Sequence, residues 1–201
     1  VLVALTAVAS LFVGAFVSRI AFSEDPPAGA PPGLPSEAEM EKMMKELAAP
    51  GEHHQWLARQ EGTWDVQMTT FSPDGSTEET KATATIRMVL GGRFQEQTFA
   101  GAFHGQPFHG TGMTGYDNFK KEFQNYWFDT MGTAPSVARG SLSSDGKVLT
   151  MKGTFEMPIG PMAFTMVVTV KSADEFTFDM SGEMGGQAFP MLKTVYKRKP
   201  K

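Results

Sequence analysis

Turn-forming residues recur every eight to twelve positions from Thr63 to the end of the chain, and this spacing limits the fold more than any other feature. Three of these turns are Pro73-Asp74-Gly75, Gly91-Gly92 and Asp145-Gly146. Between them the residues alternate between apolar and polar, as strands with one buried face do. The pattern predicts about ten short strands joined as hairpins, with no helix between them. We therefore expect an all-β domain folded as an antiparallel up-and-down β-barrel, because closure leaves no strand edge unpaired.

Alternation along each strand predicts which side chains point into the barrel, because successive side chains of a strand face opposite ways. In the strand near residue 85 the expected inward side chains are Ala82, Ala84, Ile86 and Met88. In the last strand they are Leu192, Thr194, Tyr196 and Arg198. Arg198 stands out, because a guanidinium group inside an apolar barrel needs a partner.

The first 22 residues are almost entirely apolar, and residues 1–18 carry no charge. As a helix with a rise of ~1.5 Å per residue, they would nearly cross a hydrocarbon core of ~30 Å. We predict that residues 1–22 are a signal peptide or an N-terminal membrane anchor. The protein is then expected to be exported to the cell envelope, either to the periplasm or to the extracellular face, with the membrane as a partner of this segment.

A proline-rich linker and two helices are predicted before the barrel. Residues 23–35 contain five prolines, which favour extended structure. Ser36 and Glu39 form a capping box that begins an amphipathic helix over residues 36–50. Pro50-Gly51 ends it, and a second short helix over residues 52–60 lies at the start of the barrel domain, which we place at residues 51–201.

Composition excludes several classes of function. The formal net charge of −4 argues against nucleic-acid binding, which needs a basic surface. The chain has no cysteine, and therefore no disulfide, thiolate zinc site or cysteine nucleophile. No serine lies in a Gly-x-Ser-x-Gly motif. His104 and His109 flank one turn, but no third metal ligand lies near them in the sequence, so we predict neither a metal nor a cofactor.

Gly62-Thr63-Trp64 at the start of the first strand and Arg198 on the last strand are similar to the pattern of the calycin superfamily, which includes lipocalins and fatty-acid-binding proteins. The resemblance implies a structural plug, in which Trp64 closes one end of the barrel and Arg198 lies over its ring. Such a cation–π contact contributes ~0.5–2 kcal/mol and joins the first strand to the last.

A longer series of motifs from Gly51 to Arg198 resembles the bacterial domain-of-unknown-function family 1579. The most specific parts are Gly115-Tyr116-Asp117-Asn118 and, after it, Trp127-x-Asp129. The other parts are Gly51-Glu52-His53-His54, Trp56-Leu57, Gly62-Thr63-Trp64, Gly91-Gly92-Arg93-Phe94, Phe108-His109-Gly110 and Tyr196-Lys197-Arg198. The resemblance implies a calycin-like barrel in an exported protein, and no established activity.

Five residues form the candidate ligand-binding site: Arg93, Tyr116, Asp117, Trp127 and Asp129. Trp127 and Asp129 share one face of a strand, and Tyr116 and Asp117 lie just before the hairpin that leads to it. Because consecutive strands of a meander are neighbours, we expect all five to cluster. Asp117 has a second interpretation, since Asp-Asn is also ordinary turn chemistry.

The leading hypothesis for the function is binding of a small, partly apolar or polar-headed molecule inside the barrel. Two alternatives remain open at this point. One is a cell-envelope enzyme that uses Asp129, Asp117 and Tyr116 as acid, base and donor. The other is a structural or interaction barrel whose interior is filled by its own phenylalanines and methionines.

Overall fold

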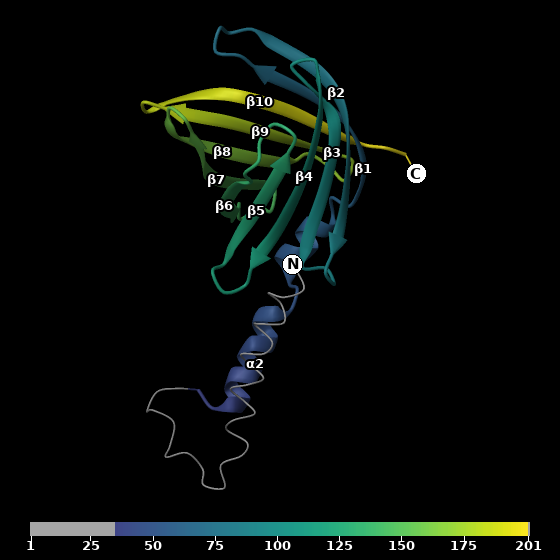
Figure 1. Ribbon diagram of the computed structural model, residues 1–201. Coiled ribbons are helices and arrows are strands. Elements are labelled where there is room, and N and C mark those ends of the chain that lie inside the picture. Colours follow the sequence, from purple (N-terminus) through teal and green to yellow (C-terminus); the bar gives the residue numbers. More distant parts are fainter. Residues whose placement is uncertain (1–34, 201) are drawn as a thin grey trace. The chain divides into compact units, whose positions relative to one another are not determined.

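The computed structural model describes residues 35–200, which form a closed barrel preceded by two helices (Figure 1). The apolar segment 1–22, and all but the last residue of the linker predicted at 23–35, lie outside the described residues, so membrane targeting and export stay predictions. Among the helices of residues 35–200, none is both long and apolar enough to span a bilayer. Of the described residues, 35–46 belong to one unit and 47–200, with α3 and the barrel, to another.

The two helices follow the local signals in the sequence. Helix α2 (Glu37–Ala48) begins with the predicted capping box: Oγ of Ser36 accepts the Glu39 N–H at 3.3 Å, and Oε2 of Glu39 accepts the Ser36 N–H at 2.8 Å. Helix α3 (Glu52–Ala58) follows Pro50-Gly51 and buries His54, Trp56 and Leu57. It ends slightly before the predicted residue 60.

Ten antiparallel strands make up the barrel, which confirms the predicted fold class. They are β1 (Gly62–Phe71), β2 (Thr77–Val89), β3 (Phe94–Phe103), β4 (Gln106–Asp117), β5 (Glu122–Asp129), β6 (Ser136–Leu142), β7 (Val148–Met157), β8 (Gly160–Val170), β9 (Glu175–Met184) and β10 (Gln187–Arg198). Each strand pairs with the next along the chain, and β1 pairs with β10 to close the barrel. This closure leaves no free edge.

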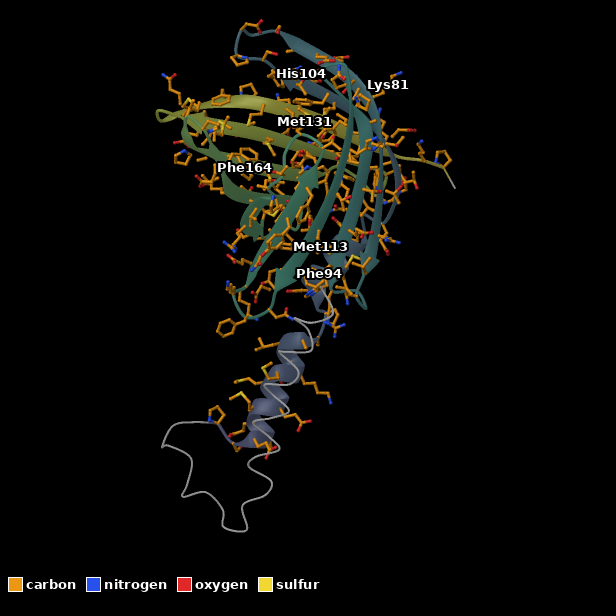
Figure 2. All side chains as sticks on the ribbon, viewed as in Figure 1. Lys81, Phe94, His104, Met113, Met131 and Phe164 are labelled. Carbon is orange, nitrogen blue, oxygen red and sulfur yellow. The ribbon has the colours of Figure 1, made fainter. Side chains whose placement is uncertain are left out.

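The two ends of the barrel differ. At one end, called here the α3 end, Trp56 of α3 donates from Nε1 to the carbonyl of Gly146 in the β6–β7 turn at 2.8 Å. At the same end, Nε2 of Gln95 donates to the carbonyl of Leu57 at 2.9 Å. The opposite end, called the open end, consists of the tips of the β1–β2, β3–β4, β5–β6, β7–β8 and β9–β10 connections. Figure 2 shows Phe94, the first residue of β3, and His104, the residue after its end, at opposite ends of the barrel.

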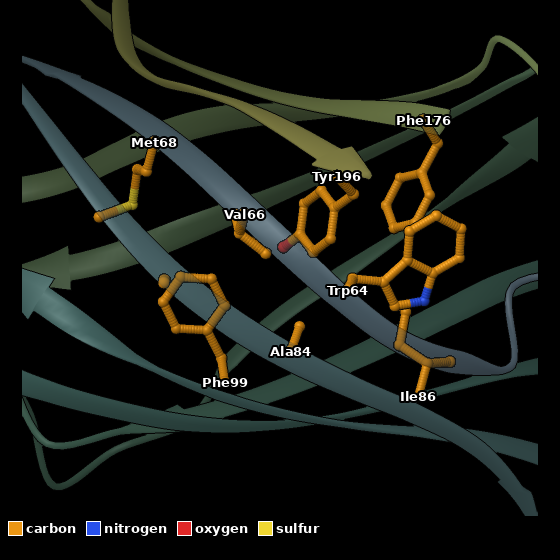
Figure 3. Packing of buried hydrophobic residues seen from close by; sticks show 9 residues of the cluster. Trp64, Val66, Met68, Ala84, Ile86, Phe99, Phe176 and Tyr196 are labelled. Atoms are coloured by element: carbon orange, nitrogen blue, oxygen red, sulfur yellow. The ribbon is translucent and has the colours of Figure 1, made fainter. Parts of the chain in front are cut away.

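The hydrophobic core consists of two clusters of inward strand side chains, the second of which also includes Trp56 and Leu57 of α3. The first surrounds Trp64 and is shown in Figure 3: Trp64, Val66, Met68, Ala82, Ala84, Ile86, Phe99, Phe176 and Tyr196. The second lies against α3: Trp56, Leu57, Phe123, Ala138, Leu149, Met151, Phe164 and Met166. The predicted inward residues of β2 are in the core, with Ala82, Ala84 and Ile86 buried.

Candidate functional site

The contact predicted between Trp64 and Arg198 is present at the α3 end. The two residues pair in register between β1 and β10, and the guanidinium carbon lies 4.2 Å from the centre of the indole ring. Nη2 of Arg198 donates to the carbonyls of Arg59 at 3.0 Å and Ala173 at 2.8 Å. Nε1 of Trp64 donates to the carbonyl of Gln60 at 3.0 Å. Nε of Arg198 also donates to Oδ1 of Asp174 at 3.1 Å, so backbone carbonyls and one surface carboxylate satisfy the inward guanidinium.

The structure shows why the first position of the Gly-x-Trp motif, residue 62, is a glycine. Its φ is +142°, a conformation that side chains rarely adopt, and a Cβ there would lie 2.5 Å from Nη1 of Arg198. The Arg198 guanidinium therefore fits beside residue 62 only because this residue has no side chain.

Arg93 lies at the α3 end, where it binds the chain that leads into α3. Its Nε donates to the carbonyl of Ala48 at 3.0 Å. Asn118 of the Gly-Tyr-Asp-Asn motif acts in the same way, since its Nδ2 donates to the carbonyls of Leu47 at 2.9 Å and Ala49 at 2.8 Å. Sequence reasoning missed this role of Asn118, because its acceptors lie about 70 residues away along the chain and nothing local marks them.

Asp117 forms the turn that follows β4, in line with its second interpretation. Its Oδ1 accepts the N–H groups of Phe119 at 2.8 Å and Lys120 at 2.9 Å. These bonds hold the pKa of the Asp117 carboxyl below its usual value, with the Lys120 N–H as the largest cause. Tyr116 packs beside α3, with its ring centre 4.0 Å from that of His53 and 5.0 Å from that of Phe123.

Trp127 and Asp129 lie toward the open end, away from the other three predicted site residues. Nε1 of Trp127 donates to Oδ2 of Asp129 at 2.9 Å, and Oδ1 accepts the Met131 N–H at 2.8 Å. Asp129 pairs with Gly110 on β4, six residues from Tyr116, which is about 20 Å at the usual ~3.3 Å per strand residue.

The expected cluster of five residues is therefore wrong. Neighbouring strands lie side by side, but their register decides which residues meet. Because a tight turn follows Asp117, Tyr116 pairs with Phe123 and not with Trp127. The structure forms two groups instead: Arg93, Tyr116 and Asp117 at the α3 end, and Trp127 with Asp129 toward the open end. No single pocket contains all three residues of the enzyme hypothesis.

Two glycines of β4 make room for the Trp127 ring on the inner face. A Cβ at Gly110 would lie 2.1 Å from Cζ2 of Trp127, and a Cβ at Gly112 would lie 2.7 Å from its Cε3. The indole ring therefore packs directly on the backbone of β4 at the two glycines. Sequence reasoning missed this pair, although Gly110-x-Gly112 places two glycines on one face of a strand, a pattern that marks a close approach.

The polar groups inside the barrel are mostly uncharged. Nε2 of Gln97 donates to the hydroxyl of Tyr196 at 3.1 Å, and burial raises the pKa of Tyr196 to about 12. Figure 3 shows the Tyr196 hydroxyl turned toward the side of Val66. Within residues 35–200, the inward hydroxyl of Thr80 on β2 is buried and has no hydrogen-bond partner.

Several inward side chains remain partly exposed, although the barrel is closed. Val168 and Phe178 pair across β8 and β9 near the α3 end, and both keep partial exposure. The same holds for Trp127, Phe155, Met180 and Leu192. Because closed walls shield inward side chains from outside, their exposure indicates a space inside the barrel that solvent reaches from the open end.

Two further hollows lie on the outer walls. One of about 210 Å³ lies beside the bulge between Pro190 and Leu192. The other, of about 220 Å³, is lined mainly by exposed side chains of β2, β3 and β4, including Thr83, Thr98 and Thr111. Neither contains a predicted site residue. In residues 35–200, no three His, Asp or Glu side chains are placed to hold a metal ion.

The buried imidazole of His54 makes stability depend on pH. Burial lowers its pKa from the ordinary 6.5, and Nδ1 accepts the Gly51 N–H at 3.0 Å, which requires a ring without a proton on that atom. Since unfolding returns the pKa to its higher value, the unfolded chain binds more protons. This contribution is complete above pH 6.5 and is lost as the pH falls through the lower folded-state pKa.

We therefore expect the free energy of unfolding to decrease as the pH is lowered below 6.5, and to decrease less in His54→Gln. Urea unfolding at a series of pH values measures both slopes. Equal slopes in wild type and variant would show that His54 does not titrate differently on folding.

No curated protein matches the sequence. Among the solved structures with a similar fold are the following two. Rv2717c from M. tuberculosis matches with a TM-score of 0.55 at 15% identity, over 76% of this chain and 100% of that chain. The S-type phycobiliprotein lyase CPES from Guillardia theta matches with a TM-score of 0.56 at 10% identity, over 83% of this chain and 99% of that chain. At these identities the likeness shows the fold alone.

The sequence also matches a family model described as a protein of unknown function, DUF1579, over residues 49–198. That range contains α3 and all ten strands, together with the Gly-x-Trp, Gly-Tyr-Asp-Asn and Trp-x-Asp motifs whose contacts are described above. The chain therefore belongs to the DUF1579 family.

Proposed function

We propose that the barrel binds a small, partly apolar molecule in its open half. The observation that carries this proposal is the partial exposure of inward side chains of a closed barrel, above all of Trp127 and Phe155 in its open half. The α3 half contains a packed layer, because Trp64, Phe123 and Leu149 are almost completely buried there, and Phe164, midway along β8, is buried as well. A molecule would therefore enter from the open end and stop above this packed layer.

One wall of the proposed site is aromatic. The ring centres of Phe99 and Trp127 lie 6.5 Å apart, and Phe108 lies 5.7 Å from Phe99 and 6.0 Å from Phe103. These rings line β3, β4 and β5 on the inner face, next to the bare glycine surface of β4. The inner face also carries flexible, partly exposed side chains such as Met180, which suit an apolar ligand of irregular shape.

A few polar groups are placed to orient the molecule. Asp129 lies toward the open end beside the Trp127 ring, the unpartnered Thr80 hydroxyl lies near the open end of β2, and the Gln97–Tyr196 pair lies further inside. Sparse polar groups in an apolar space are typical of small-molecule sites. This arrangement favours ligand binding over the filled-barrel alternative.

The comparisons support the fold and leave the ligand open. A barrel of this fold is a phycobiliprotein lyase in Guillardia theta, and one fold can serve unrelated functions. On the strength of the apolar run 1–22, we also propose that the protein works in the cell envelope.

Trp127→Ala is expected to weaken binding of Nile red, a neutral apolar dye whose emission rises in apolar surroundings, at least about tenfold because the wall of the site is removed. Tyr126→Ala is the matched control, since Tyr126 precedes Trp127 on the exposed outer face. Dye titration of the full chain measures both affinities. Wild-type protein that does not bind the dye, or equal affinity in Trp127→Ala, would contradict the proposal.

A further inference from the structure

We propose that the barrel selects apolar molecules with a positively charged head group and rejects those with a carboxylate. This inference rests on the proposed function and concerns the charge of the ligand. It is drawn from the sign of the charges that face the inner space and from how each of them is paired.

The inner face of the strands carries a single basic side chain. Arg198 faces inward, but it lies over Trp64 at the α3 end and donates to the carbonyls of Arg59 and Ala173. The other lysines and arginines of the strands are exposed and alternate with inward residues: Lys81, Arg87, Arg139, Lys152, Lys193 and Lys197. A carboxylate inside the open half would therefore find no cation.

Asp129 places a negative charge on this inner face, and its hydrogen-bond partners are neutral groups. Its partners are the indole N–H of Trp127 and the backbone N–H of Met131, at 2.9 and 2.8 Å. Among residues 35–200, no lysine, arginine or histidine forms an ion pair with it. Its charge is therefore available to a cation, and the adjacent indole ring can hold the same cation over its face.

A second carboxylate faces inward near the open end. Glu78 alternates in β2 with Thr80 and the buried Ala82, so its side chain points to the inner face. Its Oε2 lies 3.2 Å from Nδ1 of His104 at the tip of the β3–β4 hairpin. Glu78 thus has a histidine as a neighbour that can neutralise its charge, whereas Asp129 has no such neighbour among residues 35–200.

The connections at the two ends have different charges. The five open-end tips, residues 72–76, 104–105, 130–135, 158–159 and 185–186, contain no lysine or arginine. They carry exposed apolar side chains instead, Met131 and Ile159 among them. Connections at the α3 end contain Arg93, Lys120, Lys121, Lys147 and Lys171. An anion approaching these five tips meets no lysine or arginine there, only Asp74, His104 and uncharged residues, which lowers its local concentration relative to a cation.

Two probes with the same twelve-carbon tail test the inference: dodecyltrimethylammonium and dodecanoate, each used as a competitor of Nile red on the full chain below its micelle concentration. The ammonium probe is expected to bind at least about tenfold more tightly than the carboxylate at low salt, and the ratio should shrink as salt is added.

Asp129→Asn is expected to reduce this affinity ratio to about threefold or less, mainly by weakening the binding of the ammonium probe. The reason is that the amide keeps a hydrogen-bond acceptor but loses the negative charge. Glu183→Gln is the matched control, an acidic residue at the same end of the barrel whose side chain is exposed, and it should keep the wild-type ratio. A thermal melt of each variant shows that it is folded.

The outcomes separate the two proposals. If Nile red binds and dodecanoate displaces it as well as the ammonium probe does, the charge inference is wrong and the proposed function stands. An unchanged ratio in Asp129→Asn, or an equal loss in Glu183→Gln, would also overturn it. If Nile red itself does not bind, the proposed function fails, and the inference fails with it.

Discussion

Replacing Trp64 with alanine is expected to lower the free energy of unfolding by about 3–5 kcal/mol, the range for truncating a buried aromatic side chain. Trp64 is 1% exposed and packs against Phe176, with ring centres 4.7 Å apart. It also carries the Arg198 guanidinium over its ring and donates to the carbonyl of Gln60. The variant removes all three contacts where β1 meets β10. Urea unfolding followed by far-UV circular dichroism measures the change.

A double-mutant cycle isolates the contact itself. Arg198→Ala alone should destabilise the barrel, because the carbonyls of Arg59 and Ala173 lose their donor. The double variant should lose less than the sum of the single losses by roughly 0.5–3 kcal/mol, as residues in contact do. Lys197→Ala, one residue earlier on the exposed outer face, should change stability by less than about 0.5 kcal/mol. Additive losses would show that Trp64 and Arg198 do not support each other.

Gly110→Val should have the second large effect, on both stability and binding. A Cβ at this position would lie 2.1 Å from the Trp127 ring, so the ring must leave the surface of β4 and enter the inner space. Overpacking of this kind destabilises by about 1–3 kcal/mol. The displaced indole should also reduce Nile red affinity at least about tenfold, since it occupies the site and loses its bond to Asp129.

Thr111→Val is the control for this substitution. Thr111 is the next residue of β4, is exposed on the outer face, and gains an apolar group without touching Trp127. We expect its stability and dye affinity to stay near wild type. A Gly110→Val variant with wild-type affinity would show that the space beside Trp127 is not the binding site.

Local sequence determines the strands of this protein and the face that each presents. Alternation has a period of two residues and needs no distant partner, so Ala82, Ala84 and Ile86 could be assigned to the inner face directly. Turn chemistry is equally local, and Ser36 with Glu39 gave the start of α2 for the same reason. The pairing of Trp64 with Arg198 followed from a family resemblance, which supplies long-range information that alternation lacks.

Tertiary structure alone decides how far along the barrel each side chain lies, and this is why the expected clustering of the five candidate residues was wrong. Tyr116 and Asp129 belong to neighbouring strands, yet the register of β4 on β5 places them about 20 Å apart at ~3.3 Å per residue. Register depends on turn geometry and on cross-strand packing, as with Trp127 over Gly110 and Gly112, and these contacts form only once the strands have paired. The sequence by itself therefore determined the strands and the inward face of each. The register of strand pairing determined which inward side chains come into contact.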